Sequence, residues 1–136
     1  MTAGPAHSLS LRVYYEDTDM AGVVYYANYL RYLERGRSEA VRALGVDQVA
    51  MRAAGLVFVV RRVEADYLRP ARFDDTLTVE TRFGAVKGAS LVASQVVLRS
   101  GEALLRARVT LACMSLAGAP QRIPADMRKA LASAAA

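Results

Sequence analysis

From residue 56 onward, hydrophobic and polar residues alternate along most of the chain. A period of two is typical of β-strands that turn one face to a core and the other to solvent. The alternation predicts four strands, over residues 56–68, 75–83, 90–98 and 103–114. An earlier alternating stretch predicts a further strand at residues 9–16. Turn sequences such as VKGAS and RSGEA separate the later strands, so we expect these strands to run antiparallel.

One long segment, residues 27–44, follows a helical period instead. Steps of three and four place one apolar stripe along it: Leu30, Leu33, Ala40, Val41 and Leu44. Charged residues occupy the opposite side, which is typical of an amphipathic helix packed on a core. Asn28 is a candidate N-cap, and Gly45 is a natural stop. Gly36 disfavours the helix by about 1 kcal/mol relative to alanine, so we expect another backbone to approach it closely.

These elements predict an α+β architecture with a single domain. An antiparallel sheet with one apolar face needs a cover, which the long amphipathic helix can supply. Shorter helices are expected at residues 47–53 and 124–132. We therefore expect a five-stranded sheet curled around one helix in residues 9–136, preceded by a flexible tail of residues 1–8. Unpaired sheet edges favour edge-to-edge dimerisation, with a dimer of dimers as the larger alternative.

Composition narrows the class of protein. The chain has 136 residues, 54% of them hydrophobic, which is enough for a sizeable core. No apolar run approaches the roughly 18–20 residues of a membrane span, and the first residues lack the pattern of a secretory signal. Cys113 is the single cysteine, which fits the reducing cytoplasm. The net charge of +5 is spread along the chain, so we expect no nucleic-acid partner; it suits either solubility or a polyanionic small ligand.

Three carboxylates precede the long helix: Glu16, Asp17 and Asp19. A helix N-terminus carries unpaired N–H groups and a partial positive charge, which can stabilise an oxyanion. Gly22 would let the intervening loop fold back toward the helix start. The two parts of an acyl-transfer site would then lie together. The alternative is that the three carboxylates only complement the helix dipole and cap a turn.

Other catalytic chemistry finds little support in the sequence. His7, the single histidine, lies in the expected tail, which disfavours a Ser-His-Asp triad, a histidine-dependent dehydratase and a typical zinc site. Cys113 lies on the apolar side of its strand and is expected to be a core residue. The sequence has no glycine-rich phosphate loop. Carboxylate chemistry assisted by backbone donors remains.

The segment VYYEDTDMAGVVYYANYLRYLERGRSE, residues 13–39, resembles the signature of hotdog-fold acyl-CoA thioesterases. The resemblance is strongest to the 4-hydroxybenzoyl-CoA thioesterase group and to the YbgC-type, Tol-Pal-associated thioesterases. Later segments at residues 58–82, 86–91 and 113–124 are similar to the family in order and spacing. The resemblance implies the hotdog fold, a five-stranded antiparallel sheet wrapped around one long central helix. It also implies hydrolysis of acyl-CoA to a free acid and CoA, with no cofactor because CoA is part of the substrate.

The resemblance assigns roles to two residues of the first segment. Asp19 takes the position of the family's catalytic carboxylate, which acts as a nucleophile or as a general base. The backbone N–H that polarises the thioester carbonyl falls on Tyr26. Many Tol-Pal-associated members have histidine at this position, whereas the hydroxybenzoyl-type enzymes have tyrosine. Asp17 and Glu16 are left with shaping roles, and the acyl specificity stays open.

Coenzyme A is a polyanion, so basic residues at hairpin ends are candidate contacts for its phosphates. The resemblance points to the stretch Lys87, Gly88, Ala89 and Ser90 as substrate- or CoA-binding. Arg61 and Arg62 are weaker candidates, and the expected site also includes the adjacent Val60. The alternative for each basic residue is a solvated surface charge. Tyr29 and Tyr32 are expected either to line the acyl pocket or to pack in the core or an interface. An acyl carrier protein is an alternative carrier of the acyl group. The competing hypothesis for the whole chain is a non-catalytic module that binds acyl-CoA or acyl carrier protein.

Overall fold

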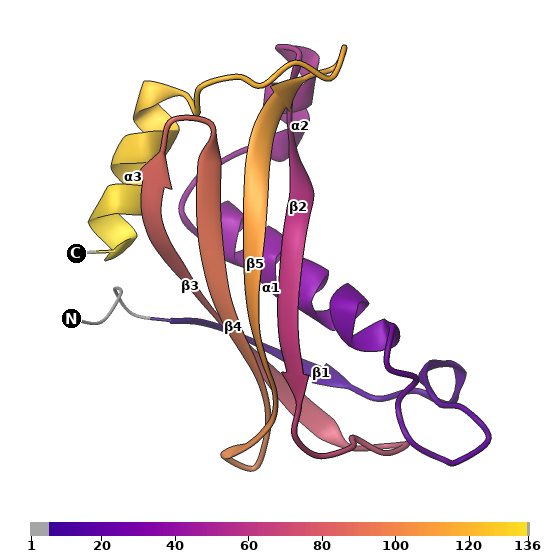
Figure 1. Ribbon diagram of the computed structural model, residues 1–136. Helices are drawn as coiled ribbons and strands as arrows, with labels where there is room; N and C mark the ends of the chain where they lie inside the picture. The colour runs from indigo at the N-terminus through magenta and orange to yellow at the C-terminus, as the bar shows by residue number, and fades with distance from the viewer. Residues whose placement is uncertain (1–5, 136) are drawn as a thin grey trace.

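Residues 6–135 are described by a computed structural model, in which one antiparallel sheet curls around a long helix (Figure 1). The sheet has five strands in the order β1-β3-β4-β5-β2. They are β1 (His7–Arg12), β2 (Leu56–Tyr67), β3 (Thr76–Lys87), β4 (Ser90–Arg99) and β5 (Glu102–Ser115). The helices are α1 (Asn28–Ala43), α2 (Gln48–Ala53) and α3 (Ala125–Ala135). The predicted arrangement of a sheet around one central helix is confirmed.

The first strand differs from its prediction at both ends. β1 begins at His7, inside the expected tail, while residues 1–5 of that tail lie outside the described residues. It ends at Arg12 rather than near residue 16, because the chain enters a 3-10 turn at Tyr15–Asp17. The Asp17 carboxylate accepts the N–H of Tyr14 at 2.8 Å, which favours the turn over an extended strand. Tyr15, which falls within the predicted strand, is consequently 82% exposed.

The buried side of α1 is shifted in its first turn from the predicted stripe. The buried residues are Tyr29, Tyr32, Leu33, Gly36, Ala40 and Val41. Leu30, predicted to face the core, is 40% exposed. The contact of Gly36 with the sheet sets the buried face, because residues three, four and seven positions earlier on a helix share its side. Those positions hold Leu33, Tyr32 and Tyr29, so two tyrosines occupy the core beside the start of the helix.

Gly36 packs directly against the inner face of the sheet. A Cβ atom at this position would lie 2.6 Å from Cγ1 of Val79 and 3.1 Å from Oγ1 of Thr81. The close approach expected at Gly36 is present, but the neighbours are side-chain atoms rather than another backbone. The buried Gln95 donates from Nε2 to the Leu33 carbonyl and to Thr81 Oγ1, both at 2.9 Å. This amide ties the middle of α1 to β3 and β4.

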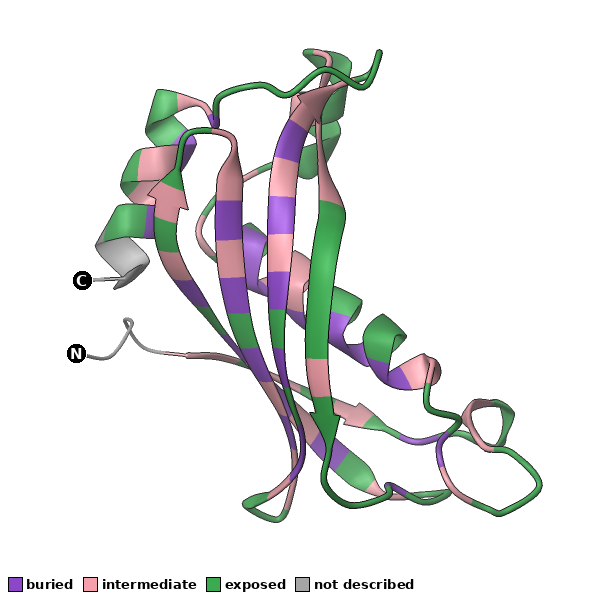
Figure 2. Cartoon of the chain, viewed as in Figure 1, coloured by how far each residue is buried: buried purple, intermediate pink, exposed green. Residues whose placement is uncertain are grey.

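The two edges of the sheet are protected differently. At one edge, β1 pairs with residues 76–81 of β3, and α3 packs against β3. At the other edge, β2 pairs with β5, and no further strand of the described chain lies beyond it. Much of β2 is exposed (Figure 2), including three apolar side chains: Val60, Val63 and Tyr67, at 48%, 40% and 47%. An exposed edge of this kind favours pairing with another strand.

Candidate active site

Residues 13–27 form one loop between β1 and α1, at the end of the sheet where β2 ends and β3 begins (Figure 1). The backbone of the β2–β3 connection holds this loop on both sides. The N–H of Val13 donates to the Asp75 carbonyl at 2.9 Å, and the N–H of Val24 donates to the Ala71 carbonyl at 2.8 Å. The position of the loop is thus set by the β2–β3 connection as well as by the strand and helix that flank it.

Asp17 holds the loop together from within. Its carbonyl accepts hydrogen bonds from the Tyr25 N–H and from Nδ2 of Asn28, both at 2.9 Å. The prediction that Asn28 caps α1 is wrong, because the N-cap position belongs to Ala27 and no side chain caps the helix there. The Asn28 amide instead fastens Asp17 to the start of the helix. These contacts give Asp17 a shaping role in the loop.

Asp19 lies in a tight turn on the exposed side of the loop. Its N–H donates to the Val23 carbonyl and its carbonyl accepts the Gly22 N–H, both at 3.0 Å. Gly22 has a φ of 77°, a left-handed conformation that glycine adopts without a steric penalty. One carboxylate oxygen, Oδ1, accepts the Ala21 N–H at 2.9 Å. Asp19 is exposed, and within residues 6–135 its other oxygen, Oδ2, accepts no hydrogen bond.

Tyr26 lies in the turn just before α1, two residues ahead of Asn28. Its carbonyl accepts the Tyr67 hydroxyl at 3.0 Å. Within the described part of the chain, its own N–H has no backbone acceptor. Its ring centroid lies 4.9 Å from that of Tyr25 and 6.3 Å from that of Tyr67. The N–H predicted to polarise a carbonyl is therefore a free donor near the positive end of the α1 dipole.

Two tyrosine hydroxyl groups near the loop, those of Tyr25 and Tyr32, have raised pKa values. The pKa of Tyr25 lies above its ordinary value, chiefly because of the neighbouring Tyr26 phenol and also because of the negative charge on Asp19. Burial, followed by the nearby Asp17 carboxylate, raises the pKa of Tyr32. Both phenols therefore stay protonated at neutral pH, and neither can act there as an anionic base.

A pocket of about 300 Å³ opens beside Tyr26. Its lining residues are Val24, Tyr26, Tyr29, Tyr67, Leu68, Arg69 and Pro70. Tyr29 is 3% exposed, and its hydroxyl accepts the Ala71 N–H at 2.9 Å, so it forms a fixed wall. Of the two tyrosines considered for the acyl pocket, Tyr29 lines this one, while Tyr32 lies in the core. Tyr67 was not anticipated; the one available signal was an aromatic residue at a strand end just before the turn at Pro70.

The predicted CoA-binding residues lie elsewhere in the fold of a single chain. Val60 and Arg61 lie in the middle of β2, where the pairing with β5 shifts register. The β3–β4 hairpin holds the other four: Lys87, Gly88, Ala89 and Ser90. This hairpin and the Asp19 loop lie at opposite ends of β3 (Figure 1), which has 12 residues and spans roughly 40 Å. One chain alone does not bring the hairpin and Asp19 together.

The remaining candidate groups take no part in this loop. Cys113 is a free, buried cysteine, and burial raises the pKa of its thiol, as expected for a core residue. Residues 6–135 contain no cluster of three or more His, Cys, Asp or Glu side chains suited to a metal ion. In the same part of the chain, no helix is both long and apolar enough to cross a membrane.

Comparison with known proteins defines the class. A solved structure of a probable thioesterase from Bartonella henselae superposes with a TM-score of 0.84 and 40% sequence identity, covering 88% of this chain and 99% of the other. A variant of 4-hydroxybenzoyl-CoA thioesterase complexed with 4-hydroxybenzoyl-CoA superposes with a TM-score of 0.86 at 23% identity, covering 93% and 99% of the two chains. The second likeness shows the fold alone. The predicted hotdog fold is confirmed by both.

The family follows from the sequence comparison. The acyl-CoA thioesterase YbgC of Haemophilus influenzae is 44% identical over 110 residues, which cover 80% of this chain and 81% of the relative. The model of the thioesterase-like superfamily matches residues 13–131. The chain belongs to the thioesterase-like superfamily. The predicted resemblance is confirmed, and with it the class of thioester hydrolases.

Proposed function

We propose that the chain is an acyl-CoA thioesterase, which uses water to cleave an acyl-CoA into a free acid and CoA. The observation that carries this proposal is the loop before α1. There the Asp19 carboxylate and the free N–H of Tyr26 belong to one hydrogen-bonded loop, and Tyr26 lines an aromatic pocket. Relatives named as acyl-CoA thioesterases support the same substrate class.

In the proposed mechanism, the pocket takes the acyl group and the Tyr26 N–H donates to the thioester carbonyl oxygen. This donor and the dipole of α1 stabilise the negative charge that develops on the oxygen. As a nucleophile, Asp19 attacks the carbonyl carbon, the C–S bond breaks, CoA leaves as a thiolate, and water hydrolyses the resulting anhydride. As a general base, Asp19 takes a proton from the water that attacks the same carbon, and the C–S bond then breaks in the same way.

The contacts to CoA are proposed to come from two copies of the chain. In an antiparallel pairing of two β2 edges about a two-fold axis, the far end of one sheet lies beside the Asp19 loop of the other. Val60 and Arg61 would then lie near the junction, and the partner's β3–β4 hairpin would approach the phosphates with Lys87. This arrangement accounts for predicted site residues that lie at opposite ends of one chain. A dimer of dimers is compatible with it.

We expect a dimeric mass in light scattering at micromolar concentration. Val63→Asp should shift the protein toward the monomer, because a charge on each copy would meet its counterpart along the unpaired edge. Val49→Asp is the control for an added surface charge, since Val49 is 80% exposed and lies on α2 rather than on the β2 strand itself. A monomeric wild type would contradict the proposed assembly, and so would a fully dimeric Val63→Asp variant.

The activity itself is tested by thiol release from a panel of acyl-CoA substrates that spans short, long and aromatic acyl groups. We expect turnover well above the spontaneous rate for at least one of these substrates. Tight binding with the thioester intact after long incubation would support instead a non-catalytic module for acyl-CoA or acyl carrier protein. The same panel, repeated with acyl groups on a carrier protein, would identify the preferred carrier.

The proposed setting is the cytoplasm. The single cysteine is free and buried, so the described fold has no need of an oxidising compartment. CoA thioesters are small-molecule substrates, and the proposed reaction consumes only the thioester and water. No further cofactor enters the proposed mechanism.

A further inference from the structure

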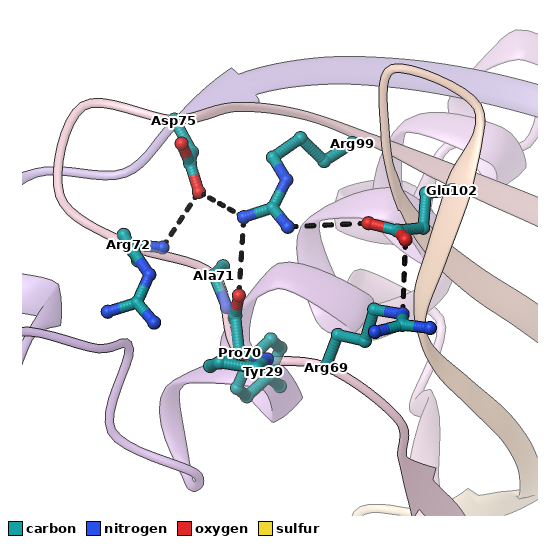
Figure 3. Close-up of polar contacts among 8 residues, drawn as sticks. All are labelled: Tyr29, Arg69, Pro70, Ala71, Arg72, Asp75, Arg99 and Glu102. Atoms are coloured by element: carbon teal, nitrogen blue, oxygen red, sulfur yellow. Dashed lines mark hydrogen bonds and ion pairs between the residues drawn. The ribbon is translucent and has the colours of Figure 1, made fainter.

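Arg99, the last residue of β4, lies beside the β2–β3 connection (Figure 3). Its guanidinium donates from one nitrogen to Oδ2 of Asp75 at 2.8 Å and to the Pro70 carbonyl at 3.3 Å. The other terminal nitrogen donates to Oε1 of Glu102 at 3.4 Å. Glu102 in turn forms an ion pair through its second oxygen, Oε2, with Nε of Arg69 at 3.0 Å. We refer to Arg69, Asp75, Arg99 and Glu102 as the Arg99 cluster.

The Arg99 cluster fixes both ends of the short segment 69–75. Arg69 and the Pro70 carbonyl are held at one end, and Asp75 at the other. The Asp75 carboxylate also accepts the Arg72 N–H at 2.8 Å, which closes the turn between them. A planar guanidinium suits this task because it presents several donors in a rigid arrangement. Arg99, a residue of β4, therefore holds both ends of segment 69–75 in place, and we call this arrangement a clamp.

Segment 69–75 is also the part of the β2–β3 connection that holds the loop of residues 13–27. Ala71, in its centre, accepts the N–H of Val24 and donates its own N–H to the Tyr29 hydroxyl. The backbones of Arg72 and Val23 form an isolated antiparallel β-bridge. The Val23 carbonyl accepts the N–H of Asp19 at 3.0 Å. An unbroken path of hydrogen bonds and short backbone steps thus leads from Arg99 to the Asp19 turn. The same segment forms a wall of the pocket beside Tyr26.

We propose that Arg99 is a positioning residue for the thioesterase reaction, which sets the place of the Asp19 carboxylate by clamping segment 69–75 through Asp75 and the Pro70 carbonyl. This inference rests on the proposed function of Asp19. Arg99 does not touch the substrate pocket directly, so its effect passes through the backbone at Ala71 and Arg72. A displacement of about 1 Å at a reacting group can lower a rate by about 10²-fold.

A neighbouring ion pair provides the contrast that tests the clamp. Arg12 and Asp74 form a 2.9 Å ion pair, but their side chains are 55% and 65% exposed, against 29% and 24% for Arg99 and Asp75. Exposed pairs contribute little because solvent screens them. Arg12 also makes no contact with the Pro70 carbonyl. The two pairs lie on adjacent residues of the same connection, so Arg12→Met is a matched control for Arg99→Met.

The experiment compares steady-state kinetics and amide hydrogen exchange in full-length wild type, Arg99→Met, Arg99→Lys and Arg12→Met. We expect Arg99→Met to lower kcat about tenfold with KM changed less than threefold, because near-attack geometry is lost while the proposed CoA contacts remain. Exchange at the Val24 and Ala71 amides should accelerate at least tenfold. Arg99→Lys should recover part of kcat, and Arg12→Met should match wild type in both measurements.

The double variant Arg99→Met/Asp75→Asn should lose little beyond the single variant, because both changes break one contact. All assays belong at a temperature where circular dichroism shows each variant fully folded, so that a general loss of stability does not lower kcat. An unchanged kcat in Arg99→Met would overturn the proposal, as would an equal loss in Arg12→Met. If wild type releases no thiol, the proposed function fails, and exchange at Val24 alone then decides whether Arg99 holds the loop.

Discussion

Replacing Asp19 with asparagine is expected to lower the rate of acyl-CoA hydrolysis by about 10²–10⁴-fold, the range for loss of a general base or nucleophile. Asparagine keeps the shape of the side chain, and its Oδ1 can still accept the Ala21 N–H that Asp19 accepts at 2.9 Å. The turn should therefore survive while the reactive oxygen is lost. The measurement is thiol release under saturating acyl-CoA, with binding of the product CoA as a check on the fold.

Glu16→Gln is the matched control for this variant. Glu16 lies three residues upstream in the same loop and is exposed, and no hydrogen bond to its carboxylate occurs among the described residues. The Glu16→Gln variant should hydrolyse the substrate at a rate close to that of wild type. Equal loss in both variants would point to the charge of the loop rather than to one carboxylate. A rate in Asp19→Asn within a few-fold of wild type would remove Asp19 from the mechanism.

Gly36→Leu is expected to reduce the free energy of unfolding by about 3 kcal/mol or more, through overpacking that a gain in helix propensity of about 1 kcal/mol does not offset. The first added carbon alone would lie 2.6 Å from Cγ1 of Val79. Val79 is 0% exposed and its strand is paired on both sides, so its stiff side chain has no room to move. Urea unfolding followed by circular dichroism measures the effect.

Arg35→Leu tests whether the effect belongs to the contact rather than to the residue type. Arg35 is the neighbouring position on the exposed side of α1, where a leucine should change the free energy of unfolding by less than about 0.5 kcal/mol. Comparable losses in the two variants would show that α1 tolerates no leucine in this turn. A stable Gly36→Leu protein would mean that α1 can move away from the sheet without loss of packing.

Alternation predicted the sheet well because each strand of a curved sheet has one inner and one outer face. The long helix was predicted equally well, because apolar residues spaced three and four apart differ clearly from the period of two in the strands. Its first turn was misjudged because Leu30 fits the stripe as well as Tyr29 does, and only contact with the sheet at Gly36 decides between them. The predicted first strand was too long, because the hydrogen bond from the Tyr14 N–H to the Asp17 carboxylate favours a turn over the strand. The alternation of apolar and polar residues contains no sign of this hydrogen bond.

The site was predicted in part. Asp19 and Tyr26 lie close in sequence, so a motif can identify them together. The pocket wall at Tyr67 lies 41 residues from its partner Tyr26, and Arg99 lies 24 residues from Asp75. Such pairs are brought together by the pairing of strands, and neither period nor composition marks them. The β3–β4 hairpin, Lys87 to Ser90, was assigned to the same site as Asp19. Within one chain, however, the hairpin and Asp19 lie at opposite ends of β3.

The two edges of the sheet differ in length, and this difference limits how many copies of the chain can join edge to edge. A chain with two long open edges can add copies without limit, as fibres do. Here the edge beyond β3 is occupied by the six-residue β1 and by α3. The twelve-residue β2 is the long edge left open. Pairing of two copies through β2 would use that long edge in both and would leave only the short outer edge of β1 for a third copy.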